Sequence, residues 1–227
     1  MSTKLKSQLG LVFLILLVSV PTFFRMLRFG IYPMHDFHIF RLYEFNLCIK
    51  DLVFPCRWAP DAGFGYGEPL FNFYSPLSYF IGEPFVLLGL SIINSTKIAF
   101  IISLVGSAIS MYFLSFHLWK NKLAGLLSAV LYVYAPYRAV DAWVRGALPE
   151  SLAFVFFPVV LLTVEKYFSH QKTFYLILFS LALTALLLTH NLSFLMFLPI
   201  LGIWLIYRLH TLNRWNLLPK ILLGLGL

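Results

Sequence analysis

Long stretches of apolar residues without a charged side chain constrain the fold of this chain more than any other feature. The 22 residues from Ile98 to Trp119 include no Asp, Glu, Lys or Arg. A helix needs about 20 largely apolar residues to cross the hydrocarbon core of a bilayer. Only 11% of the 227 residues are charged and 60% are hydrophobic, whereas about a quarter of a soluble domain is charged. The chain is therefore predicted to be an all-α integral membrane protein.

Other apolar segments extend this prediction to a polytopic bundle of about six or seven transmembrane helices. The first has no small-x-small cleavage site after Ser19, so we interpret it as an uncleaved helix. The chain ends at Leu227 inside an apolar run, from which we expect residues 1–227 to be the N-terminal portion of a longer module. The additional segments are Leu9 to about Phe29, Leu123–Tyr137, Ser151–Val164, Thr173–Thr189, Leu192–Tyr207 and a start after Lys220.

The 17 Lys and Arg side chains, which outnumber nine Asp and Glu, indicate the sidedness of the bundle rather than a nucleic-acid partner. The ambiguous segment is Pro76–Ile93, which Gly82-Glu83-Pro84 interrupts. If this segment does not span, nine of the 17 basic residues lie inside; if it does, only five do. Because Lys and Arg accumulate on the cytoplasmic side, we predict a surface helix at Pro76–Ile93 and a cytoplasmic N-terminus.

This topology places the polar segments of the chain together outside the cytoplasm. The first external loop covers about residues 30–96, the second covers about 138–150, and the turn at Asn191 lies on the same side. The predicted location is a cell (inner or plasma) membrane. Cys48 and Cys56 lie eight residues apart in the first loop, outside any C-x-x-C pair, which gives zinc and thioredoxin-like sites no support. A disulfide between them is possible if the loop is external.

Asp36 is the leading candidate for a catalytic base. It follows the first span, where a carboxylate is costly unless it binds a charge or moves a proton. The alternative is that Asp36 only caps a helix that starts near Phe37. His35 and His38 flank it and are weak candidates for metal ligands, since histidine and carboxylate suit zinc or manganese. Their alternative role is that of interfacial histidines bonded to backbone or lipid headgroups.

Glycines at positions 63, 65 and 67 interrupt an aromatic-rich part of the first loop. They form a G-x-G-x-G sequence, but no strand precedes it and no helix start follows it, so a nucleotide-binding loop is rejected. A tight irregular loop is expected instead. Its aromatic residues, including Trp58 and Tyr66, either stack on a sugar or belong to an interfacial aromatic belt.

Four charged residues in the second loop, Arg138, Asp141, Arg145 and Glu150, form another candidate site. Two arginines beside an apolar groove would clamp the phosphate of an anionic lipid. The alternative is a neutralising network of Arg138–Asp141 and Arg145–Glu150 pairs. In the next external turn, His190 either bonds a phosphate or ends its helix.

Several segments resemble bacterial membrane proteins called 6-pyruvoyl-tetrahydropterin synthase-related. They are His35-Asp-Phe-His-Ile-Phe-Arg41, Arg57-Trp-Ala-Pro-Asp, Gly65-Tyr-Gly-Glu-Pro-Leu-Phe-Asn-Phe-Tyr-Ser-Pro-Leu77, Ala135-Pro-Tyr-Arg138 and Arg145-Gly-Ala-Leu-Pro-Glu150. The resemblance covers roughly residues 5 to 220. In layout these proteins are similar to the GT-C superfamily of glycosyltransferases, which use lipid-linked sugars.

The resemblance implies a membrane glycosyltransferase that moves a sugar from a polyprenyl-phosphate donor to a glycan or lipid acceptor on the external face. Asp36 occupies the place of the general base in such enzymes. Arg57, Arg138 and Arg145 would neutralise the leaving phosphate, with Glu150 and His190 beside them. Arg41 is a further candidate. The first loop has no Asp-x-Asp sequence, so no cofactor is assigned and use of Mg²⁺ or Mn²⁺ stays open.

Two alternatives remain. A transporter, flippase or scaffold of the cell envelope would hold an anionic lipid with the same arginines, but it should carry ionisable residues near the bilayer midplane. The predicted spans are almost free of charge, which favours chemistry at the external face. The second alternative is a fragment without activity. The sequence leaves sugar, acceptor and oligomeric state open.

Overall fold

The computed structural model describes residues 3–30 and 36–225, and within these residues the fold is helical with one isolated β-bridge, between Ala59 and Glu68. Four helices are long and apolar enough to cross a membrane: α1 (Thr3–Phe23), whose apolar window is Gly10–Leu27, α5 (Ile92–Trp119), α8 (Leu148–His170) and α10 (Asn191–Thr211). The predicted all-α membrane fold is confirmed.

In the described residues, four or five helices qualify as candidate spans, against the six or seven expected. Helix α6 (Lys122–Val133) and the segment Pro136–Arg145 meet at an angle of 46° and together provide a fifth candidate span. Helices α9 (Thr173–Thr189) and α11 (Leu218–Leu225) are shorter. The bend falls at Pro136, which occupies the first turn of the next helix. Proline cannot continue the hydrogen-bond ladder of the preceding helix, so the apolar run breaks there.

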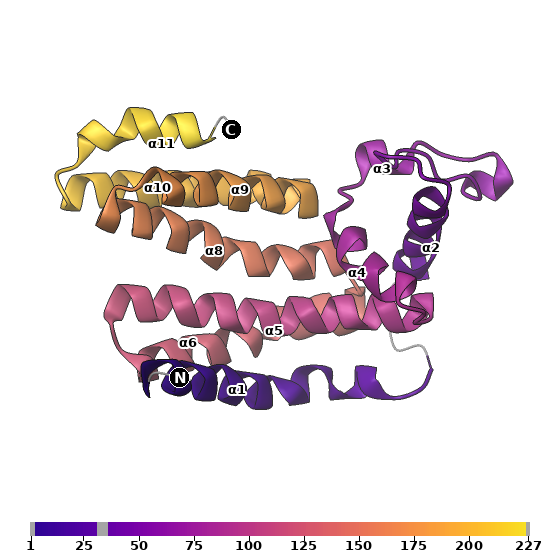
Figure 1. The fold of residues 1–227 in the computed structure, drawn as a ribbon, viewed down its shortest axis with the longest axis horizontal. Coiled ribbons are helices and arrows are strands. Elements are labelled where there is room, and N and C mark those ends of the chain that lie inside the picture. The colour runs from indigo at the N-terminus through magenta and orange to yellow at the C-terminus, as the bar shows by residue number, and fades with distance from the viewer. Residues whose placement is uncertain (1–2, 31–35, 226–227) are drawn as a thin grey trace.

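The long helices run side by side along the longest axis of the molecule (Figure 1). Helices α1, α5 and α6 form one layer, and α8 to α11 lie against it through contacts between α5 and α8. Small residues allow this close approach, as in other membrane bundles. A Cβ on Gly106 of α5 would meet Val155 of α8 at 3.2 Å, and the hydroxyls of Ser103 and Ser151 lie 2.8 Å apart.

A lobe of short helices covers one end of the bundle (Figure 1). It contains α2 (Asp36–Lys50), the turn η2 (Gly63–Gly65), α3 (Leu70–Phe73) and α4 (Leu77–Leu87). Eleven residues of α-helix extend only about 16 Å, so α4 does not span, as the count of basic residues predicted.

Aromatic packing and a covalent bond hold the lobe together. Phe45 of α2 contacts Phe71 and Phe80 edge to face, with ring centroids 5.5 and 4.7 Å apart. The disulfide considered from the sequence is present and joins Cys48 at the end of α2 to Cys56. Disulfides persist in oxidising compartments. This bond therefore agrees with the predicted external position of the lobe.

Two hydrogen bonds fasten the lobe to the bundle. The backbone N–H of Leu148, at the start of α8, donates to Nε2 of His38 at 3.3 Å. The hydroxyl of Ser75 donates to the carbonyl of Leu187 in α9 at 3.2 Å. The start of α2 and the segment before α4 are thus held beside the ends of α8 and α9 that face the lobe.

A buried carboxyl in the lobe makes its stability dependent on pH. Asn46 donates to Oε1 of Glu83 at 2.6 Å, but Oε2 has no hydrogen-bond partner. Burial raises the pKa of Glu83, and the Asn46 bond and Lys50 only partly oppose this. Because the pKa of Glu83 is higher in the folded state than in the unfolded state, the stability that its neutral form provides is present at low pH. This stability is lost as pH rises through the folded-state pKa.

Replacing Glu83 with Gln should therefore stabilise the protein at pH 8 and change little at pH 4, where both side chains are neutral. Thermal unfolding in lipid nanodiscs at the two pH values measures the difference. If the melting temperatures of the wild type and Glu83→Gln differ by the same amount at both pH values, Glu83 does not have a raised pKa in the folded protein.

Candidate functional site

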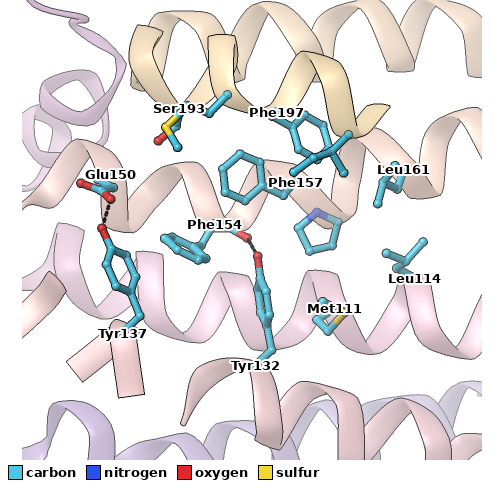
Figure 2. Close-up of a pocket in the computed structure, with 13 residues that line it drawn as sticks. Met111, Leu114, Tyr132, Tyr137, Glu150, Phe154, Phe157, Leu161, Ser193 and Phe197 are labelled. Atoms are coloured by element: carbon cyan, nitrogen blue, oxygen red, sulfur yellow. Dashed lines mark hydrogen bonds between the residues drawn. The ribbon is translucent and has the colours of Figure 1, made fainter. Parts of the chain in front are cut away.

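An apolar groove of about 550 Å³ lies between α5, α6, α8 and α10, and its polar end faces the lobe (Figure 2). Most of its wall is formed by hydrophobic side chains, which include Met111, Phe154 and Phe197. Tyr137, Glu150 and Ser193 supply polar groups at one end. A groove with one polar end matches the shape of an amphiphile, whose chain is apolar and whose head is polar.

The polar end is built from Tyr137, Arg145 and Glu150. The Tyr137 hydroxyl donates to Glu150 and accepts a hydrogen bond of 2.7 Å from Nη1 of Arg145. The same Nη1 lies 2.8 Å from Oε2 of Glu150. The side chain of Arg145 is 48% exposed, and its Nη2 and Nε have no hydrogen-bond partner in the described parts of the chain. Two N–H edges of this guanidinium thus stay available for an anion.

Arg138 has a different environment, although it was predicted to share a phosphate clamp with Arg145. Its side chain is 1% exposed, and its guanidinium lies over the Phe154 ring at 4.4 Å. It donates to the Ser151 carbonyl at 3.1 Å and to the Ser107 hydroxyl at 3.2 Å. Arg138 therefore connects three helical segments inside the bundle and offers no open face to a lipid phosphate.

The neutralising network among these charges is present and centres on Asp141. This fully buried carboxylate lies 3.9 Å from Nη1 of Arg138 and 3.6 Å from Nη1 of Arg145. Neither of its oxygens has a hydrogen-bond partner. The pairing differs from the prediction in one respect, because Arg145 is shared between Asp141 and Glu150.

The backbone explains why Arg145 and Glu150 meet. Residues 138–150 were expected to form a loop, but α7 (Pro136–Ala139) leads directly into a π-helical turn, η3 (Val140–Arg145). Gly146 then adopts a left-handed conformation with φ of 58°. This conformation favours glycine. The reversal turns the chain into α8, so that residues on both sides of Gly146 converge on the groove.

His190 lies between α9 and α10, where it follows the last residue of α9 and its side chain caps the start of α10. The helix-ending role was one of its two predicted alternatives, and phosphate binding stays a prediction. Nδ1 of His190 accepts the backbone N–H of Ser193 at 3.3 Å and lies 2.7 Å from the Ser193 hydroxyl. Burial lowers the pKa of His190, and the nearby Arg145 lowers it further while Glu150 opposes both. A neutral imidazole donates or accepts a hydrogen bond but adds no positive charge for a phosphate.

His38 is committed to the protein through both ring nitrogens. Because Nε2 accepts from Leu148, the ring proton lies on Nδ1, which donates to the Tyr79 hydroxyl at 3.0 Å. Neither nitrogen therefore keeps a lone pair for the metal ion that was considered. Within the described ranges, no group of three or more His, Cys, Asp and Glu side chains could hold a metal. His35 lies outside the described residues, as does the side chain of Asp36, at which α2 begins.

The remaining candidates lie on the lobe. Arg41 is partly buried, and its guanidinium lies 3.7 Å from the centre of the Tyr74 ring. It forms no ion pair with a carboxylate in the described parts of the chain, and Tyr74 precedes the Ser75 bond to α9. Arg41 therefore packs against aromatic rings of the lobe, with Phe37 as a second ring at 5.6 Å. Arg57 lies in the exposed loop beyond α2, with Trp58 and Tyr66, and makes no contact with Arg138 or Arg145.

The prediction from sequence missed three polar residues of the groove, Tyr132, Tyr137 and Ser193. Tyr137 stands in the Ala135-Pro-Tyr-Arg138 segment, so its motif was noticed but its side chain was not. The 13-residue separation from Glu150 corresponds to no helical repeat, since the Gly146 reversal lies between them. Tyr132 and Ser193 are single polar residues in apolar segments and form no pattern that would mark them.

Comparison with known families adds one result. A family model described as "6-pyruvoyl-tetrahydropterin synthase related domain; membrane protein" matches residues 71–225. The matched region includes Arg138, Asp141, Arg145, Glu150 and His190, whereas Asp36 and most of the lobe precede it. No curated protein and no solved structure matches the chain.

Proposed function

The chain belongs to the 6-pyruvoyl-tetrahydropterin synthase related family of membrane proteins, and from this premise we propose that it is a membrane glycosyltransferase. It would transfer a sugar from a polyprenyl-phosphate donor to a glycan or lipid acceptor. The reaction would take place at the lobe end of the bundle, on the external face of a cell membrane, with the N-terminus in the cytoplasm.

The observation that supports this function most is the groove with one polar end. Met196 and Ile200 line it and are more than half exposed, so it is open to the side of the bundle. An isoprenoid chain could occupy its apolar part, which would place the phosphate near Arg145. The disulfide in the lobe agrees with a reaction outside the cytoplasm.

The proposed step is a single displacement at the anomeric carbon. An acceptor hydroxyl oxygen forms a bond to this carbon while the bond to the phosphate oxygen breaks, and the lipid phosphate leaves with the electron pair. Asp36 takes the proton of the attacking hydroxyl. Arg145 stabilises the charge on the departing phosphate through Nη2 and Nε. Attack from the face opposite the phosphate inverts the configuration of the sugar carbon.

The second candidate function, a lipid transporter or scaffold of the envelope, requires anion binding without transfer. Buried charges do exist inside the bundle, at Arg138 and Asp141 and, 15 residues after Glu150 along α8, at Glu165, which pairs with Arg208 at 2.6 Å. Each charge is paired locally, however, and the pairs do not continue into one another as a chain of ionisable groups. This arrangement favours a site at the membrane surface over a path across it.

Replacing Arg145 with Ala is expected to reduce sugar transfer by about 10- to 100-fold, because a charge-assisted hydrogen bond contributes about 1.5–3 kcal/mol. The transfer rate of Arg145→Lys should lie between those of the wild type and Arg145→Ala, since lysine keeps the charge but lacks the planar guanidinium. The measurement is incorporation of radiolabelled sugar from the lipid carrier into membrane glycan.

Arg28→Ala is the matched control, because it removes an exposed arginine just after the short helix η1 (Phe24–Leu27), away from the groove and from the loop beyond α2. It should retain full transfer. If Arg28→Ala keeps full transfer and Arg145→Ala does so too, the phosphate is bound elsewhere. If wild-type protein binds the lipid carrier but transfers no sugar from it, the transporter or scaffold function is favoured.

A further inference from the structure

The loop between α2 and α3 exposes aromatic side chains that the fold does not use. It projects from the lobe away from the long helices (Figure 1). Trp58 is 51% exposed, Tyr66 is 90% exposed, and Phe64 is fully exposed. The interior of the lobe is already filled by other rings, such as Phe45, Phe71 and Tyr79. These three rings therefore face outward without contributing to the core.

The loop has a defined backbone conformation. Ala59 and Glu68 exchange two backbone hydrogen bonds, of 2.8 and 3.0 Å, which close the loop at its base. The N–H of Asp61 donates to the buried Glu44 at 3.1 Å, which ties the loop to α2. Gly63, Gly65 and Gly67 all have positive φ values. Such a loop presents its side chains in fixed directions.

Gly67 holds the indole of Trp58 in place. A Cβ at this position would meet the Nε1, Cε2 and Cζ2 atoms of Trp58 at 2.5–2.6 Å. The indole therefore lies directly against the glycine backbone, which leaves its other side open. The absence of a side chain at Gly67 thus orients an aromatic surface outside the bundle.

Two of the three charged side chains near these rings are acceptors. Asp61 and Glu68 are exposed, and the exposed Arg57 is the one basic residue of the loop. Flat aromatic faces contact the C–H faces of sugar rings, and carboxylates accept hydrogen bonds from sugar hydroxyls. A membrane-anchoring loop would instead carry more basic than acidic residues and lie at the level of the helix ends.

We propose that the loop of residues 57–68 is a binding platform for an oligosaccharide, with Trp58 and Tyr66 as its stacking surfaces. Its biological role as the place where the acceptor glycan is held rests on the proposed transferase function. Helix α2 connects the platform to the start of the lobe at Asp36 over 15 residues, or about 22 Å. An acceptor bound at both places would be several sugar units long.

The test measures sugar binding by the full chain in lipid nanodiscs without any donor lipid. The probes are immobilised tetrasaccharides of glucose, mannose, N-acetylglucosamine and galacturonic acid. Wild-type protein should bind at least one of them, and Trp58→Ala and Tyr66→Ala should each weaken that binding by about tenfold or more. Gly67→Ala keeps every aromatic ring but displaces the indole, so it should weaken binding as well.

Phe54→Ala is the matched control. Phe54 is an exposed ring of the same lobe that lies outside the closed loop and contacts Phe80 of α4. This variant should bind the sugar like the wild type, and Trp58→Ala, Tyr66→Ala and Phe54→Ala should keep the wild-type melting temperature. Gly67→Ala is expected to lower the melting temperature, because alanine is strained at the positive φ of this position.

The proposal is overturned if the wild type binds none of the tetrasaccharides, or if Trp58→Ala and Tyr66→Ala bind like the wild type. A nitroxide label on Phe64→Cys adds a membrane test. The label should collide with a water-soluble nickel chelate, and a lipid-depth signal would overturn the proposal and assign the loop to the bilayer surface. Transfer to a short acceptor, measured separately, reports on the transferase function, so the two failures can be distinguished.

Discussion

Replacing Asp36 with Asn should lower sugar transfer by about 10²–10⁴-fold, which is the usual contribution of a general base. The amide is nearly isosteric but cannot take the proton of the acceptor hydroxyl. Helix α2 begins at this residue, and His38 in its first turn is bonded to the start of α8. The backbone of Asp36 is thereby held at the lobe end of the bundle, where the proposed reaction would require the base.

The transfer assay should separate this loss from a loss of binding. Asp36→Asn should still bind the donor lipid, because the proposed phosphate contact belongs to Arg145. Asp51→Asn, which removes an exposed carboxylate just beyond the other end of α2, serves as the control and should remain active. If Asp36→Asn keeps full transfer while Glu150→Gln loses it, the base is Glu150 and the role given to Asp36 is wrong.

Replacing Arg138 with Met should reduce the free energy of unfolding by about 3–5 kcal/mol, the usual cost of breaking a buried ion pair from one side. The change removes two hydrogen bonds and the cation–π contact with Phe154. It also leaves Asp141 fully buried with Arg145 as its only cation at a distance of 3.6 Å. Most of the cost should come from this uncompensated carboxylate.

A double variant separates these contributions. Arg138→Met combined with Asp141→Asn removes both charges and should recover much of the lost stability, because no unpaired charge then remains buried. Arg57→Met, at an exposed arginine, should change stability by less than about 0.5 kcal/mol. Unfolding by SDS titration in mixed micelles provides the free energies. If Arg138→Met has the wild-type free energy of unfolding, the Arg138–Asp141 pair makes no net contribution to stability.

The fold class and the grouping of the polar segments could be predicted because both depend on sums over many residues. Apolar runs of bilayer length identify membrane helices, and the distribution of basic residues was sufficient to reject a span at Pro76–Ile93. In the described residues the candidate spans are fewer than expected because two of the predicted segments form shorter helices, α9 with 17 residues and α11 with 8. The bend after α6 falls at Pro136, inside the predicted span Leu123–Tyr137.

The candidate site was harder to predict because burial decides the role of each charge. Arg138 and Arg145 are seven residues apart and chemically identical, yet one is enclosed by Ser107, Ser151 and Phe154 while the other keeps open N–H groups. Sequence spacing suggested both an ion-pair network and a phosphate clamp for these residues. Only their positions relative to the groove distinguish an internal connection from a candidate binding group.

The lateral opening of the groove has a consequence for how a ligand would be supplied. Because Met196 and Ile200 face outward while they line it, a hydrophobic chain can enter from the side without passing through water. The encounter then takes place by diffusion within two dimensions. Occupancy of the site would depend on the mole fraction of the ligand among the membrane lipids rather than on its amount per volume of solution. Dilution with inert lipid, and not with buffer, would therefore empty the groove.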